Sequence, residues 1–159
     1  MEPEIVTIAE RILIGKRLTM SFAENRTPEL WRSFMPQRKS IDSVNDELFS
    51  VALYSADFFN AFDPAAPFEK WAAMQISSLQ NATENMETLT IPAGRYAVFH
   101  YKGSSDDAAK IFDYIFNNWL PRSGYKLDKR PHFEILGERY KNGDPESEED
   151  IYIPIKPIE

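Results

Sequence analysis

RYAVFHYKG, residues 95–103, is the stretch that decides the fold, because it begins the part of the chain with the clearest pattern. It is rich in β-branched and aromatic residues and follows the breaker sequence PAG at 92–94, so it is predicted to be a β-strand. The serines and aspartates of SSDD at 104–107 suit the cap and first turn of a helix, and PRSG at 121–124 is expected to end it. The apolar stripe of this helix, at spacings of three and four, is Ala108, Ile111, Phe112, Ile115, Phe116, Trp119 and Leu120.

Two more strands follow this helix. HFEILGERY at 132–140 has strand composition, and DIYIPIK at 150–156 places three isoleucines on one face. Between them, NGDPESEED at 142–150 is expected to be a solvated acidic turn. The second half of the chain therefore has the predicted order strand, helix, strand, strand.

The first half repeats this order less clearly, about eighty residues earlier. Its predicted elements are strand ILIGKRLTM at 12–20, helix TPELWRSF at 27–34, and strands FSVALYS at 49–55 and WAAMQISSL at 71–79. This period suits duplication of one βαββ unit, with the polar segment 81–90 as the linker.

We expect an α+β fold made of two such units, with antiparallel sheets, pseudo-twofold symmetry and a central ligand cleft. Each unit is too small for a comfortable core of its own, so residues 1–159 are predicted to form one domain. Repeat one spans about 1–80, and repeat two about 91–157. A concave surface between similar lobes is a natural place for a ligand.

The composition excludes several classes of function. The formal net charge of −7 disfavours direct binding to nucleic acid, because such binding depends on Lys and Arg. No apolar run is long enough to cross a membrane and the N-terminus lacks a secretory pattern, so we expect a cytoplasmic protein that does not interact with membranes. Cysteine is absent, which removes disulfides and cysteine-ligated metals and fits a reducing compartment.

We predict no metal site and no cofactor. The two histidines, His100 and His132, fall on different predicted strands without the spacing of paired ligands. The acidic turn at 142–150 lacks the pattern of a calcium-binding EF-hand loop. Ordinary strand and surface roles are therefore expected for all of these residues.

Glu134 raises a question, because it is a carboxylate in the middle of a strand. Alternation puts Phe133 and Ile135 on one side of this strand and Glu134 with Leu136 on the other. If the first pair packs on the helix, Glu134 points away from it, together with Tyr152 of the last strand. This second face meets either water or a cleft, and in a cleft the carboxylate would sit among aromatic rings and favour lipophilic cations.

The sequences IPAGRYAVFHYKG, WLPRSGY and HFEILGERYKNGDPESEEDIYIPIK resemble the GyrI-like family, the effector-binding domain of bacterial multidrug-responsive and AraC-type transcription regulators. The likeness is strong over residues 91–156 and looser across the first half. It implies a tandem βαββ fold with an aromatic-lined pocket that binds amphipathic small molecules. Regulator members carry a helix-turn-helix upstream, and too few residues precede the first predicted strand for one here, so a stand-alone sensor or sequestering domain is expected.

The resemblance also implies site residues. A glutamate that contacts lipophilic cations in drug-binding relatives matches Glu134, a neighbouring tyrosine matches Tyr152, and an apolar pocket position matches Leu136. Weaker aromatic candidates for the pocket are Tyr96, Tyr54 and Trp71. Trp119 continues the apolar stripe of its helix and is predicted to be core. The cluster of Phe58, Phe59 and Phe62 is either a pocket lid or a buried loop anchor.

Three functions compete at this stage. The leading one is binding of a cationic or aromatic amphipathic molecule without turnover. The second is implied by stand-alone members of the family that hydrolyse strained cyclopropane-bearing genotoxins; here Glu134 would be the catalytic acid or base and Tyr152 would orient water or substrate. The third is binding to a protein partner such as a topoisomerase, because the family name comes from a DNA gyrase inhibitor.

Overall fold

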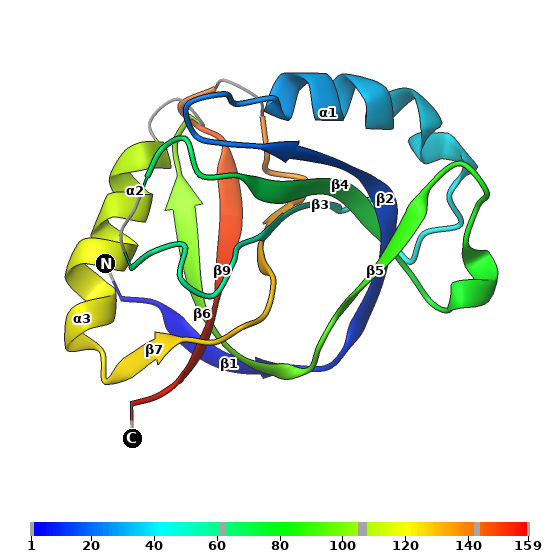
Figure 1. Cartoon of the computed structure of the whole chain (residues 1–159). Coiled ribbons are helices and arrows are strands. Elements are labelled where there is room, and N and C mark those ends of the chain that lie inside the picture. Colours follow the sequence, from blue (N-terminus) through cyan, green and yellow to red (C-terminus); the bar gives the residue numbers. More distant parts are fainter. Residues whose placement is uncertain (1, 61–62, 105–107, 142–143, 159) are drawn as a thin grey trace.

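One antiparallel sheet runs through the molecule in the order β1-β6-β9-β8-β3-β4-β2-β5, with β7 paired to β9 (Figure 1). The computed structural model describes residues 2–60, 63–104, 108–141 and 144–158. The strands are β1 (Glu4–Ile8), β2 (Arg11–Met20), β3 (Leu48–Leu53), β4 (Phe68–Ile76), β5 (Glu87–Ile91), β6 (Gly94–Lys102), β7 (Tyr125–Leu127), β8 (His132–Leu136) and β9 (Glu148–Pro157).

The helices are few and lie along the outside of the curved sheet (Figure 1). They are α1 (Thr27–Phe34), α2 (Ala108–Tyr114) and α3 (Leu120–Arg122), with a π-helical segment at Ile115–Trp119 joining the last two. Two 3₁₀ segments, Met35–Ser40 and Leu79–Asn81, follow α1 and β4. The α+β class and the antiparallel pairing expected from the sequence are confirmed.

The sheet order reads alike from its two ends. β3 and β8 meet at the centre, followed outward by β4 and β2 on one side and by β9 and β6 on the other. The strands that precede each half are exchanged, since β1 pairs with β6 and β5 pairs with β2. This order is what duplication of one βαββ unit would produce, although the duplication and the repeat boundaries stay predictions.

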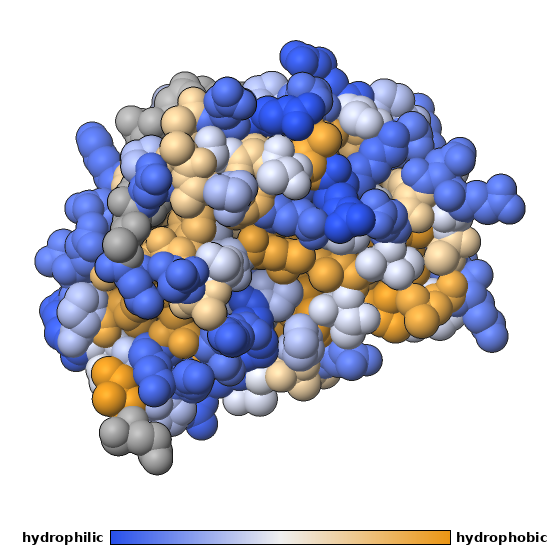
Figure 2. Space-filling model, viewed as in Figure 1, coloured by the Kyte–Doolittle hydropathy of each residue, from blue (hydrophilic) through white to orange (hydrophobic). Residues whose placement is uncertain are grey.

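Two faces of the sheet have different partners. The inner face, enclosed by the curve of the sheet, carries one buried cluster to which every strand except β7 contributes; its largest side chains are Phe49, Trp71, Tyr96 and Phe133. The outer face meets the helices in two separate clusters, one under α1 and one under α2 and the π-helical segment. Hydrophobic surface crosses the middle of the view in Figure 2 and is bordered by hydrophilic residues.

The three isoleucines of the last strand pack under α2, as predicted: Ile151, Ile153 and Ile155 belong to the same cluster as Ile111 and Ile115. The prediction for the neighbouring strand, β8, was wrong.

Phe133 and Ile135 do not face the helices but belong to the inner cluster. The reason is the register of β8 against β9, which puts Phe133 directly opposite Tyr152 and Glu134 opposite Ile151. Residues directly opposite each other share a face. Glu134 therefore lies on the helix side of the sheet, and Tyr152 lies on the other side.

Several element boundaries also differ from the sequence prediction. The segment 81–90 contains most of β5 and is therefore only partly a linker, and β1 and β7 were not predicted. Strand 132–140 ends at Leu136, and β9 begins at Glu148 inside the predicted acidic turn. The predicted cap residues 105–107 lie outside the described residues. No helix in the described part of the chain has the length and hydrophobicity needed to cross a membrane.

Candidate functional site

Glu134 lies at the centre of the sheet, between the areas that the two helices cover. On β8 it is opposite Ser50 of β3 and Ile151 of β9. Ser50 is a small buried neighbour, 8% exposed. Leu136 is buried at 9% exposure and shares the outer face with Glu134, as predicted, while its role in ligand binding stays a prediction.

Glu149 is the partner of Glu134 and was not predicted. It is 8% exposed, and its carboxyl group donates a hydrogen bond to that of Glu134. Burial, and then the negative charge of Glu134, raise the pKa of Glu149 to about 9. The sequence reading assigned Glu149 to a solvated turn. Its position two residues before Ile151, on the same side of the strand, was the available signal.

Lys70 is a second charged group that the sequence reading missed, because the predicted strand began one residue later. It is opposite Ala52 of β3, and its Nζ donates a hydrogen bond of 3.1 Å to Oγ1 of Thr27 at the start of α1. Burial lowers the pKa of Lys70, while the nearby charges of Glu134 and Glu149 act in the opposite direction. Among the described residues, no carboxylate oxygen lies within the 4.0 Å of a salt bridge from this amine.

Aromatic rings form the wall next to these charges. Tyr54, just after β3, is 4.9 Å from the His132 ring and meets it edge-on. Phe59 stacks on Phe116 of the π-helical segment at 4.7 Å and lies 5.8 Å from His132. Phe59 thus connects the segment after β3 to the helical segment that follows α2.

Burial controls the ionisation of this wall. It lowers the pKa of His132 to about 3, so this ring is neutral at physiological pH. Burial, followed by the charge of Glu134, raises the pKa of Tyr54. The second effect shows that Tyr54 lies close enough to Glu134 for the carboxylate to disfavour ionisation of the tyrosine hydroxyl. We define the buried carboxyl site as Glu134 and Glu149 together with Lys70, Tyr54 and His132.

The remaining predicted pocket residues lie on the inner face, away from the buried carboxyl site. Tyr152 stacks on Phe133 with ring centroids 4.5 Å apart. Tyr96 is fully buried and donates a hydrogen bond of 3.1 Å to the carbonyl of Pro131. Trp71 is 3% exposed, and its Nε1 donates a bond of 2.7 Å to Glu69.

The expectation that Glu134, Leu136 and Tyr152 share one face was therefore wrong for Tyr152. Of the six predicted ligand-binding residues, the structure brings together Glu134, Leu136 and Tyr54. The other three were assigned to the pocket without knowledge of strand register, which alone decides the face.

The other aromatic candidates divide clearly. Trp119 is buried at 5% exposure and packs edge-on against Phe99, as predicted for core. Phe58 is also buried and lies 4.7 Å from Tyr54, and Phe59 takes part in the wall described above. Phe62 lies outside the described residues.

An open cleft of about 720 Å³ lies at the end of β8 and β9. Glu149 lines it, whereas its residues His100, Glu148 and Asp150 lie on the inner side of the sheet, as Tyr152 does. The cleft contains two cationic side chains, His100 and Arg139, and a larger number of acids. The lining acids are Asp46, Glu47, Glu138, Glu148, Glu149 and Asp150. Such a surface attracts cations, and Glu149 is one of its acids.

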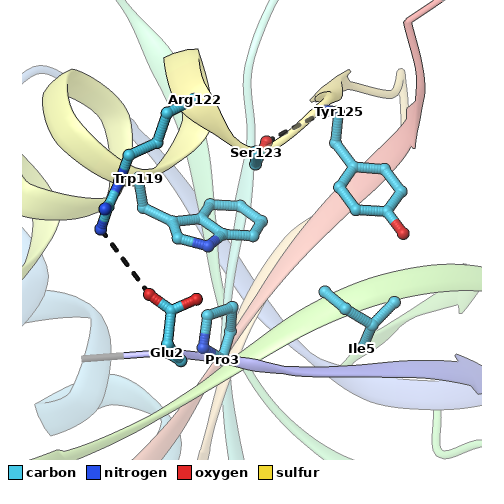
Figure 3. A pocket seen from close by; sticks show the side chains of 7 residues that line it. All are labelled: Glu2, Pro3, Ile5, Trp119, Arg122, Ser123 and Tyr125. Carbon is cyan, nitrogen blue, oxygen red and sulfur yellow. Dashed lines mark hydrogen bonds and ion pairs between the residues drawn. The ribbon is translucent and has the colours of Figure 1, made fainter.

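A smaller cavity of about 310 Å³ lies elsewhere, between β1 and the segment that joins α3 to β7 (Figure 3). Arg122 and Glu2 approach to 3.6 Å on one side of it, and Tyr125 stands on the other (Figure 3). None of the residues of the buried carboxyl site lines this cavity.

The two histidines have different surroundings. His100 contacts Glu148 through Nε2 at 2.6 Å and Asp150 through Nδ1 at 2.9 Å, and hydrogen bonds to these two carboxylates raise its pKa. His132 lies on the opposite face of the sheet. No cluster of three or more His, Asp or Glu side chains suited to a metal ion occurs within residues 2–60, 63–104, 108–141 and 144–158.

Comparison with known proteins places this geometry in a family context. The family model of the GyrI-like small molecule binding domain matches residues 1–156. The transcriptional regulator BrlR of Pseudomonas aeruginosa is 29% identical over 98% of this chain, which spans 56% of the length of BrlR. A DNA gyrase inhibitor of Yersinia enterocolitica is 38% identical over 53 residues, 33% of this chain and 34% of that protein.

Solved structures share the fold. SAV2435 bound to tetraphenylphosphonium aligns over 98% of this chain and 94% of its own, with a TM-score of 0.67 and 15% identity. A hydrolase from Listeria innocua aligns over 98% of this chain and 92% of its own, with a TM-score of 0.63 and 11% identity. At these identities the likeness concerns the fold alone.

Proposed function

Because this chain belongs to the GyrI-like family of small-molecule-binding domains, we propose that it binds amphipathic aromatic cations beside Glu134. The observation that carries the proposal is the pair of carboxyl groups, buried Glu149 and half-buried Glu134, next to the aromatic wall. A lipophilic cation offers apolar area to the rings and a positive charge to the carboxylate, which a neutral ligand lacks.

The acidic cleft supports the same ligand class. Its side chains place negative charge next to Glu149, which belongs to both cleft and site. A cation entering from this side would lose water gradually while approaching an opposite charge. An anion would be repelled along the same route.

Rough magnitudes indicate moderate affinity. Burial of about 300 Å² of apolar ligand surface at about 25 cal/mol per Å² contributes roughly 7 kcal/mol before the costs of ordering. A charge-assisted contact adds about 1.5 to 3 kcal/mol. We therefore expect dissociation constants of about micromolar order, with the charge discriminating cation from neutral analogue by about one to two decades.

The test compares two ligands with the same three phenyl rings, methyltriphenylphosphonium and the neutral triphenylphosphine oxide. Isothermal titration calorimetry should show tighter binding of the phosphonium to the wild type. Glu134→Gln should reduce this preference by about tenfold or more and leave the oxide nearly unchanged. Glu87→Gln is the matched control, because Glu87 is an exposed carboxylate of β5 that pairs with Arg17 and lies outside the site and the cleft. Equal affinities of wild type and Glu134→Gln for the phosphonium would contradict the proposal.

Hydrolysis of a strained cyclopropane is a second candidate, favoured by one observation. Glu149, whose pKa is raised, is a protonated acid in hydrogen-bond contact with Glu134, so a proton donor and a proton acceptor stand side by side. Glu134 would take a proton from water as the water oxygen attacks a ring carbon. The breaking carbon–carbon bond would take up the proton of Glu149.

This candidate is separated from simple binding by following the ligand itself. An activated cyclopropyl ketone incubated with the wild type would give the ring-opened hydrate, detected by mass spectrometry. Product formed at full rate by both Glu134→Gln and Glu149→Gln would contradict the mechanism. Tyr152, assigned to orient water in the sequence reading, is not available for that role because it lies on the inner face.

Binding to a protein partner such as a topoisomerase stays a prediction. The relative named DNA gyrase inhibitor aligns with 33% of this chain. Co-purification of gyrase with the immobilised protein, together with failure to bind either triphenyl ligand, would favour this function over the first.

A further inference from the structure

The buried carboxyl site includes a basic side chain, Lys70, which affects the charge balance when a cationic ligand binds. Its amine reaches the site from β4 and is held by Thr27 at the start of α1. It feels the charges of Glu134 and Glu149, yet it forms no salt bridge within 4.0 Å with any described carboxylate. The Lys70 amine is therefore more than 4.0 Å from the carboxylate oxygens of the described residues, yet it is close enough to interact electrostatically with Glu134 and Glu149.

Two carboxyl groups in hydrogen-bond contact share one proton, because two adjacent negative charges out of water repel each other. The pair then carries one negative charge. Burial lowers the pKa of Lys70 and the charges of Glu134 and Glu149 oppose this effect. With Lys70 in its cationic form, the charges of the empty site add to about zero. Neutrality is the favourable state for buried groups, since an uncompensated charge inside a protein is costly.

Other titratable groups surround Glu149, and the charge of Asp150 acts in the same direction as that of Glu134 on its pKa. Tyr101 of β6, opposite Glu149, donates a hydrogen bond to the Ser104 carbonyl. Tyr54 is a neutral phenol at the far side of Glu134, and His132 is an uncharged ring. The remaining nearby groups are Tyr140 after β8, Asp150 of β9, and the exposed cleft residues Asp46, Glu47, His100, Glu138, Arg139 and Glu148.

We propose that Glu134, Glu149 and Lys70 form a cation-for-proton exchange site, in which a bound monovalent cation expels the proton shared by the two carboxyl groups, and Lys70 sets this one-for-one exchange. The proposal rests on the proposed function. Before binding, the charges are plus one on Lys70 and minus one on the carboxyl pair. After binding, they are plus one on Lys70, plus one on the ligand and minus two on the pair, with one proton released to water.

The direction of the pH dependence follows. At neutral pH the free site holds the proton, because the pKa of Glu149 is raised to about 9, and the bound cation lowers that pKa. Affinity for a permanent cation should therefore rise with pH, by up to about tenfold per unit, and level off near the pKa of the free site. The neutral oxide should show no such dependence.

Two substitutions separate the parts of the exchange. In Lys70→Met the pair can keep its proton and still neutralise the ligand, so proton release should fall towards zero and affinity at pH 6 should increase. In Glu149→Gln no proton is available, so affinity should be independent of pH and equal to the low-pH value of the wild type. Lys16→Met is the matched control for the lysine, because Lys16 also bonds a hydroxyl of α1, Ser33, but on an exposed surface.

The first measurement is calorimetric titration with methyltriphenylphosphonium at pH 7.4 in phosphate and in Tris. Because the two buffers have different ionisation enthalpies, the difference in binding heat gives the number of protons released. The second measurement is the dissociation constant between pH 5.5 and 8.5. We expect release of nearly one proton by the wild type and by Lys16→Met, and nearly none by Lys70→Met and Glu149→Gln. Thermal melts of each variant confirm folding.

Binding by the wild type with no proton release, or the same release by wild type and Lys70→Met, would overturn the exchange and leave the proposed function standing. Absence of phosphonium binding by both wild type and Lys70→Met at every pH would overturn the proposed function, and the exchange with it.

Discussion

Phe133 and Tyr152 lie directly opposite each other on β8 and β9, with ring centroids 4.5 Å apart and ring planes 13° from parallel. Because side chains alternate along a strand, this stacked pair fixes the side on which their neighbours lie. Glu134 and Ile151 are thereby directed to the helix side. The same register that stacks these two rings on the inner face therefore places the Glu134 carboxylate on the outer face.

Replacement of Tyr152 should affect stability and leave cation binding almost unchanged. Tyr152→Leu keeps apolar bulk but loses the stacking on Phe133, which is worth about 0.5 to 1.5 kcal/mol beyond buried area. Urea unfolding should show a loss of about that size, and the dissociation constant for methyltriphenylphosphonium should stay within about twofold of the wild type. A tenfold loss of affinity in a folded variant would instead place Tyr152 in the site.

His132 should make the fold sensitive to acid. Burial lowers its pKa from 6.5 to about 3 in the folded state, so below pH 6.5 the unfolded chain binds a proton that the folded chain refuses. The free energy of unfolding should therefore fall as pH drops from about 6.5 towards 3, by at most about 1.4 kcal/mol per unit.

Urea unfolding at several pH values in this range measures that slope. His132→Phe should flatten it, since the ring keeps its aromatic neighbours without titrating. His100→Gln should retain it, because His100 is largely exposed and its pKa is raised, which gives the opposite sign. An unchanged acid slope in His132→Phe would refute the assignment.

Phe59 should control the rate at which ligands reach the site. It stacks on Phe116 at 4.7 Å and joins the segment after β3 to the helical segment after α2. Phe59→Ala removes this connection, so stopped-flow measurements with a fluorescent lipophilic cation should give faster association and faster dissociation, each by severalfold. Phe112→Ala is the comparison, because Phe112 stacks on Phe116 from the helix side alone, at 6.5 Å. Equal rates in wild type and Phe59→Ala would show that Phe59 is only part of the wall.

Gly15 should be irreplaceable for a steric reason. A Cβ at this position of β2 would lie 1.9 Å from the carbonyl oxygen of Ala72 on β4, so the two strands would have to separate. Gly15→Ala is expected to cost about 2 kcal/mol or more of unfolding free energy. Gly137→Ala is the control, since the nearest atom to its added carbon is 3.8 Å away, and it should change stability little. Equal stabilities of the two variants would contradict this account.

Local signals in the sequence were sufficient for most of the elements. The start of α1 is indicated by Thr27, Pro28 and Glu29. The helix begins at Thr27 and ends at Phe34, as predicted. The isoleucines of 150–156 alternate strongly enough to identify their buried face. β1 and β5 were missed because each is a short strand of five residues with largely exposed positions, which carries little hydrophobic pattern.

The candidate site was predictable only in part. Glu134 was found because a carboxylate within an apolar strand is unusual and because the family resemblance pointed to it. Lys70 carries no such local signal, and that of Glu149, its position two residues before Ile151, is weak, since charged residues at strand ends are usually solvated. Their burial results from neighbours far away in the sequence.

The sequence by itself determined the composition of the strands and helices, the absence of thiol chemistry, and the presence of one glutamate among apolar residues. These properties depend on each residue and on those within a few positions of it. Tertiary structure alone decided which face Glu134 occupies, that Glu149 contacts it, and that Lys70 stands near both. Strand register and helix placement bring these groups together, and a shift of one residue in register would move each of them to the other face.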